Sequence, residues 1–179
     1  MMDEYEIEEL LKQPYNADDV NPPETQDKTD PNRMAIARTS WGEARNQGDD
    51  GMKLVQHVIK KRAEQDKYNW PDNAYEVTRQ PSQFSVWNEG DPNRAKMEAL
   101  DINSTDPEFK KAYEMVDKPL PEHLEKFKDA DHYHTNKVQP SWSKSPELRK
   151  IGSHGDHIFY TTKPGTGVTP AANMSSGNL

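Results

Sequence analysis

The feature that most constrains the fold of this chain is a pair of consecutive helical patterns between residues 31 and 66. Asp30 and Pro31 make a strong helix start, because an aspartate caps free N–H groups and proline fits the first helical position. The apolar face of this first helix comprises Met34, Ala37, Trp41 and Ala44. Gly48 separates it from a second helix near Asp49, with an apolar stripe of Met52, Val55, Val58, Ile59 and Arg62. The sequence therefore predicts a helical hairpin over residues 31–66.

The segments after this hairpin are shorter and mixed in type. We predict a helical turn followed by a short strand at Gln83–Val86, and further helices over Asp106–Asp117 and Pro121–Lys128. The sequences "HYHTNKV" and "HIFY" are typical of brief strands. The expected fold class is therefore α+β, a helix-rich domain with a small β element.

The charge of the chain is concentrated at one end and divides it into three parts. Residues 1–30 hold ten acids and two bases, which equals the whole formal charge of −8. We expect an acidic N-terminal helix and linker over 1–30, a catalytic domain over 31–162 and a flexible tail over 163–179. Tyr5, Ile7, Leu10 and Leu11 give residues 3–13 an amphipathic helical pattern.

Several classes of function are disfavoured by composition. The neutral remainder has no basic stripe of the kind that nucleic-acid binding requires, so we expect no nucleic-acid partner. No apolar run is long enough to insert in a membrane, and the absence of cysteine removes disulfide and thiol chemistry. The acidic start differs from a secretory signal, which predicts that another component delivers the protein if it acts outside the cytoplasm.

Glu43, in the sequence "ARTSWGEAR", is the main candidate for chemistry. It lies in the last turn of the first predicted helix, where free carbonyl groups disfavour a carboxylate and raise its pKa, and partial burial adds to this effect. Trp41 and Gly42 would supply an apolar wall and a close backbone approach. A glutamic acid with a raised pKa at a cleft edge suits protonation of a glycosidic bond, whereas an ordinary solvated acid is the alternative.

Four segments in order resemble the SleB-like cell-wall hydrolase family, the spore-cortex-lytic type also found in phage lysins. They are "ARTSWGEARNQGDDGMKLVQHVIKKR", "QPSQFSVWN", "DADHYHTNKVQPSW" and "IGSHGDHIFY". The resemblance covers roughly residues 33–160. Two departures occur, because Lys61-Arg62 stands where the family has Asn-Arg and the last segment carries two or three extra residues.

The resemblance implies a compact lysozyme-like domain that cleaves the β-1,4 bond between N-acetylmuramic acid and N-acetylglucosamine in peptidoglycan. Carried over to matching positions, Glu43 would be the general acid. Trp41 would lie beside it, and the groove would be lined by Gln83, Phe84, Ser85, Tyr133, His134 and Trp142. Aromatic faces suit sugar C–H surfaces, and the polar groups suit sugar hydroxyls.

Glu43 is the one catalytic carboxyl group that we recognise in the matched motifs, whereas an ordinary glycosidase needs two. Asp49 and Asp50 are better explained as helix caps. A lytic transglycosylase avoids the second group, because the acetamido and 6-hydroxyl groups of the substrate complete the reaction and leave a 1,6-anhydro end. The resemblance favours this route without any cofactor, and hydrolysis with a second acid remains the alternative.

Two other classes of function compete with this interpretation. Five histidines after residue 120 give a possible zinc site for an amidase or peptidase: His123, His132, His134, His154 and His157. Against zinc, the sequence lacks HExxH and cysteine. A non-catalytic virion protein with the same fold is the second alternative.

The resemblance sets the expected partner and location. The partner is bacterial peptidoglycan, with residues 1–30 as a possible contact to a virion protein. We expect synthesis in the host cytoplasm and action at the wall, either after release through a holin-made pore as an endolysin or from the virion.

Overall fold

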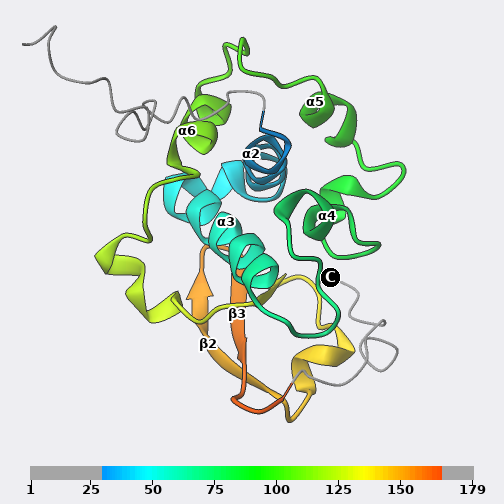
Figure 1. Cartoon of the computed structure of the whole chain (residues 1–179), viewed down its shortest axis with the longest axis vertical. Helices are drawn as coiled ribbons and strands as arrows, with labels where there is room; N and C mark the ends of the chain where they lie inside the picture. The colour runs from blue at the N-terminus through cyan, green and yellow to red at the C-terminus, as the bar shows by residue number, and fades with distance from the viewer. Residues whose placement is uncertain (1–29, 167–179) are drawn as a thin grey trace, which may run out of the picture.

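The computed structural model describes residues 30–166, and Figure 1 shows their arrangement. The expected helix within residues 1–30 and most of the expected tail over 163–179 lie outside the described residues. Within 30–166 no helix is long and apolar enough to cross a membrane.

The predicted helical hairpin is confirmed and forms the centre of the molecule. Helix α2 spans Pro31–Ala44 and helix α3 spans Gly48–Glu64, joined by the 3-10 turn η1 over Arg45–Gln47. The Asp30 carboxylate caps α2 by accepting from the Asn32 N–H at 2.9 Å. The backbone φ of Gly48 is +75°, a value that favours glycine and lets the chain turn between the helices.

Shorter helices surround α2, which is viewed nearly end-on in Figure 1. They are α4 over Ala74–Arg79, η2 over Ser85–Trp87, α5 over Arg94–Glu98 and α6 over Pro107–Met115, whereas η3 over Glu122–Phe127 lies beside α3 and β2. Helix α6 begins where the sequence predicts, because the Asp106 carboxylate accepts from the Phe109 N–H at 2.7 Å. Its predicted neighbour over Pro121–Lys128 is present as the 3-10 helix η3.

The predicted strand at Gln83–Val86 is wrong. This segment ends in the 3-10 turn η2, and the Val86 N–H donates to the Glu43 carboxyl instead of to a neighbouring strand. The side-chain pattern suited a strand, but no partner strand lies beside it.

The sheet has three antiparallel strands in the order β1-β3-β2. Strand β1 spans His132–Thr135 and β3 spans His157–Thr162, which confirms the two predicted strands. The sequence analysis missed β2 over Leu148–His154, whose residues other than Leu148 are exposed or half-buried and lack the usual apolar alternation. Helices and this small sheet together confirm the α+β class.

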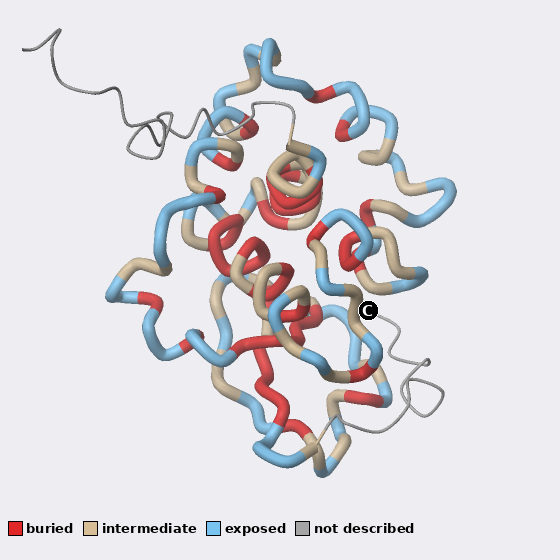
Figure 2. The backbone as a smooth tube through the Cα atoms, viewed as in Figure 1, coloured by how far each residue is buried: buried red, intermediate tan, exposed pale blue. Residues whose placement is uncertain are grey.

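The buried residues form two groups. The larger core joins α2, α3, the shorter helices and β3, and Figure 2 shows burial concentrated along α2, α3 and the sheet. The stripe predicted for α3 is buried in it throughout. A smaller group of Trp142, Leu148 and Tyr160 packs separately.

Candidate active site

The Glu43 carboxyl group is where three distant segments meet. Its Oε1 accepts from the Val86 N–H at 2.9 Å and from the Ser85 hydroxyl at 3.2 Å. Its Oε2 accepts from the Tyr133 hydroxyl at 3.1 Å. The side chain is half-buried, so it is held on both oxygens and still reaches solvent.

Gly42 allows η2 to approach α2 this closely. A Cβ atom at position 42 would lie 2.4 Å from Cγ2 of Val86 and 3.2 Å from Sδ of Met97. Because real Cβ atoms do not come so near to other carbon atoms, any larger residue would push η2 away from Glu43. The close backbone approach expected from the sequence is therefore present.

Burial raises the pKa of the Glu43 carboxyl above its ordinary value. Hydrogen bonds from Val86, Tyr133 and Ser85 oppose this increase in pKa, and the negative charge of Asp91 adds to it. The direction agrees with the sequence analysis, but the physical cause is different. Removal from water and a nearby carboxylate raise this pKa, whereas the sequence analysis put the end of the helix first.

Tyr133 forms the wall opposite Glu43. Its ring lies 6.3 Å from the ring of Phe84 and 4.8 Å from that of His157, measured between centroids. Burial and the charge of Glu43 raise the Tyr133 pKa well above its ordinary value, so the phenol keeps its proton. Burial also favours the neutral form of His157, because it lowers the pKa of this residue to about 4. A neutral imidazole therefore packs against Tyr133.

Arg62 fixes the segment that carries Ser85. The Arg62 guanidinium is fully buried, donates to Gln83 Oε1 at 2.9 Å and donates to the Asp131 carbonyl at 2.8 Å. One side chain of α3 thereby connects the segment before η2 to the start of β1. The sequence analysis placed Arg62 on an apolar stripe; an arginine in such a stripe was the available signal for this role.

The other predicted site residues lie away from Glu43. Trp41 is two residues along α2 and faces α6, with its indole N–H donating to Asp106 at 3.0 Å. His134 and Trp142 lie with Tyr160 in the smaller core, where the His134 and Tyr160 rings stack at 5.5 Å. The structure therefore brings Gln83, Phe84, Ser85 and Tyr133 to the Glu43 side, and places Trp41, His134 and Trp142 elsewhere.

Two acids near the site had no recognisable signal in the sequence. Asp91 follows η2, and its charge acts on Glu43 as described above. Asp156 lies in the β2–β3 turn, where its N–H donates to Gln47 Oε1 at 2.8 Å and its carboxylate accepts from Gln47 Nε2 at 3.1 Å. This reciprocal pair of hydrogen bonds connects the β2–β3 turn to η1, the turn that follows the helix of Glu43.

Asp49 and Asp50 lie in the first turn of α3, as the sequence analysis favoured, although neither caps it with a hydrogen bond. Asp49 pairs with Lys111 at 3.5 Å and Asp50 with His123 at 2.8 Å. Both therefore have partners away from the Glu43 carboxyl.

The histidines do not assemble into a ligand set. In residues 30–166 no group of three His, Asp or Glu side chains is placed to hold a metal ion. His132 bonds to the Asp131 carboxylate, His134 bonds to Thr135 and Tyr160, and His157 lies on the Tyr133 side of the sheet. His157 therefore lies on the opposite face of the sheet from His132 and His134, which both lie beside Trp142.

A comparison with known proteins places the chain in a family. The model of the family described as Cell Wall Hydrolase matches residues 46–160, which is more than half of the chain. Neither the curated proteins nor the solved structures gave a match. The matched range contains η2, β1 and the first four residues of β3, and begins three positions after Glu43. The chain therefore belongs to the SleB-like cell wall hydrolase family, as an enzyme that acts on peptidoglycan of the bacterial cell wall.

Proposed function

We propose that this protein cleaves the β-1,4 bond between N-acetylmuramic acid and N-acetylglucosamine, with Glu43 as the general acid. The observation that carries the proposal is the Glu43 carboxyl itself, half-buried, hydrogen-bonded on both oxygens and raised in pKa. A carboxylic acid with a raised pKa keeps its proton to a higher pH and can donate it to a leaving oxygen.

The hydrogen bonds indicate which oxygen carries the proton. The Val86 N–H can only donate, so it holds Oε1 as an acceptor. The Tyr133 and Ser85 hydroxyls can donate or accept, and both adapt to either protonation state. We assign the acidic proton to Oε2, the oxygen that faces Tyr133.

The proposed reaction is a transglycosylation within the substrate. Glu43 gives its proton to the glycosidic oxygen as the bond from C1 of the muramic residue to that oxygen breaks, while the neighbouring acetamido group supports the cation. The 6-hydroxyl oxygen then bonds to C1 and returns its proton to Glu43. The products are a 1,6-anhydromuramyl end and a free 4-hydroxyl, and the enzyme is regenerated without a cofactor.

Hydrolysis is the second candidate, and Asp91 is the observation that favours it. Two carboxyl groups whose charges interact are the usual equipment of a glycosidase. In this route Asp91 would activate water, and the product would carry a reducing end that is heavier by one water. Mass spectrometry of the released muropeptides distinguishes the two outcomes.

Fewer residues are proposed to contact the substrate than the motifs predicted. Gln83, Ser85 and Tyr133 remain as substrate contacts beside Glu43, with Phe84 as buried support at 1% exposure. For His134 and Trp142 we propose a supporting role in the smaller core. A role in phage lysis or entry rests on the resemblance to phage lysins.

The test is Glu43→Gln, which keeps the shape and removes the acid. We expect at least a hundredfold loss of activity on purified sacculi, the lower range for loss of a general acid. Glu89→Gln is the matched control, because Glu89 is an exposed acid in the turn that follows η2. Wild-type clearing by folded Glu43→Gln protein would refute the assignment.

A further inference from the structure

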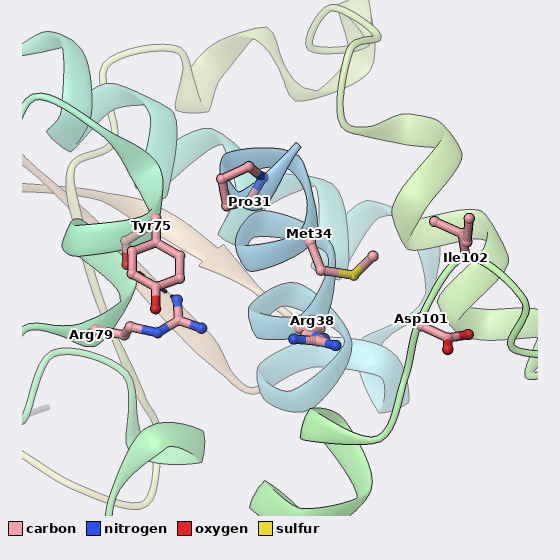
Figure 3. A pocket seen from close by; sticks show the side chains of 7 residues that line it. All are labelled: Pro31, Met34, Arg38, Tyr75, Arg79, Asp101 and Ile102. Atoms are coloured by element: carbon pink, nitrogen blue, oxygen red, sulfur yellow. Dashed lines mark hydrogen bonds between the residues drawn. The ribbon is translucent and has the colours of Figure 1, made fainter. Parts of the chain in front are cut away.

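A second surface of the molecule exposes apolar side chains far from the catalytic carboxyl. Three large hydrophobic residues are exposed within residues 30–166, and two of them, Tyr75 at 43% and Ile102 at 44%, line one cavity of about 260 Å³. Figure 3 shows Pro31 and Met34 of α2 between them. Exposed apolar side chains gathered in a hollow are typical of a binding surface rather than of chance exposure.

The same cavity carries an excess of positive charge. Arg38 and Arg79 line it against the single acid Asp101. The Arg79 guanidinium lies 3.7 Å from the centroid of the Tyr75 ring and 4.2 Å from that of Trp87, so stacking holds it in place. Arg38 donates twice to the Leu100 carbonyl and keeps its remaining N–H groups for another acceptor. An occupant that fits is both apolar and acidic.

The chain itself contains a segment with this chemistry, and it joins the domain at the edge of the cavity. Pro31 lines the cavity, so residues 1–29 connect directly to its rim. These residues include nine acids and two bases. Within them, residues 3–13 carry the amphipathic pattern of Tyr5, Ile7, Leu10 and Leu11 among five acids. We propose that residues 3–13 dock in this cavity of their own chain, with the leucines on Tyr75 and Ile102 and the acids on Arg38 and Arg79.

The length of the connection permits this docking. Residues 14–29 separate the segment from Asp30, and a chain of that length reaches at most about 55 Å when fully extended. Short tethers give effective concentrations of about 1 mM. An interaction with a dissociation constant of about 100 μM between separate molecules would therefore be about 90% formed within one chain.

The docking surface is distinct from the Glu43 site. Arg38 and Glu43 are five residues apart on α2, which places them about 140° apart around the helix axis. Trp87 lies between the two regions and donates its indole N–H to Thr39 at 2.9 Å. The proposal is thus independent of the reaction that Glu43 performs, and its test does not read activity.

Because the natural sequence contains no cysteine, two introduced cysteines are the only thiols in a cross-linking test. The test chain is full-length Leu10→Cys, Ile102→Cys, oxidised under mild conditions, with intramolecular disulfide measured by the mass change after thiol blocking. The matched control is Leu10→Cys, Glu114→Cys. Glu114 is exposed on α6 beside Tyr113, whose carbonyl accepts from Arg33 at 3.1 Å, so it is also near the start of α2. Helix α6, which carries Glu114, lies across α2 from α4, which carries Tyr75 and Arg79 of the cavity (Figure 1).

We expect the Ile102 pair to close at least tenfold faster than the Glu114 pair, and 1 M NaCl to reduce this ratio by screening the charges. Equal rates for the two pairs would overturn the proposal. So would disulfide-linked dimers as the main product of the Ile102 pair, because the cavity would then bind a second copy. A ratio unchanged by salt would overturn the pairing of acids with Arg38 and Arg79.

Discussion

The two faces of strand β1 have different chemistry although they are built from adjacent residues. Tyr133 faces the larger core and donates to Glu43, whereas His132 and His134 face the smaller core with Trp142 and Tyr160. The first face joins three segments at a titratable group with a raised pKa, and the second packs aromatic rings against each other. Closeness in the sequence thus does not make these residues one site, because successive side chains of a strand point to opposite faces.

The largest expected effect is a loss of stability on the face of β1 that packs in the smaller core. Trp142→Ala should lower the free energy of unfolding by about 3 kcal/mol, because it removes a buried ring from the smaller core. Chemical denaturation measures this loss. We expect the protein that stays folded to keep its activity, and a folded variant without activity would show that Trp142 belongs to the catalytic face.

Gly42→Ala tests the catalytic face without touching a polar group. The added Cβ would meet Val86 at 2.4 Å, move η2 and misplace the donors to Glu43. We expect a loss of activity of about a hundredfold in sacculus clearing, as displacements of about 1 Å can produce. Gly152→Ala is the control, because its Cβ would meet other side chains only at an ordinary 3.8 Å. Equal activity of the two variants would contradict the role of close packing.

A matched pair of tyrosines compares the two faces most directly. Tyr133→Phe removes the donor to Glu43, whereas Tyr160→Phe removes the partner of His134 at 3.1 Å. We expect about a tenfold loss of activity for Tyr133→Phe, of the size of one lost hydrogen bond, and little change for Tyr160→Phe. Turnover on soluble glycan substrates, with melting curves as the folding check, would reveal an opposite order if the assignment is wrong.

The smallest expected effect is a shift in the pH profile. The proposed mechanism requires protonated Glu43, so activity should fall as the pH rises through the pKa of this group. The charge of Asp91 raises that pKa, and Asp91→Asn should lower it, which moves the alkaline limb to lower pH. If Asp91→Asn instead abolishes activity at every pH, Asp91 takes part in the chemistry and hydrolysis is favoured over transglycosylation.

Much of the fold was predictable because its signals are local. Asp30 and Pro31 start α2, Gly48 separates the two helices, and Asp106 caps α6, each through bonds within a few residues. Strand β2 was missed because it buries only Leu148 fully and is stabilised by pairing with β3 rather than by an apolar pattern of its own. The strand predicted at Gln83–Val86 is wrong because its pattern suits a strand but its Val86 N–H group donates to Glu43 instead of to a neighbouring strand.

The sequence by itself determined the helical hairpin, the family motifs and the choice of Glu43 as the candidate acid. Only the tertiary structure decided which residues surround that acid, because the partners come from η2 and β1, 42 to 90 positions away along the chain. It also made burial the main cause of the raised pKa, which the sequence analysis had named only as an addition to the helix end, since burial depends on the packing of distant segments around the carboxyl. A local pattern can predict the helix or strand in which a residue lies, but the solvent exposure and the charged neighbours of that residue are properties of the folded chain.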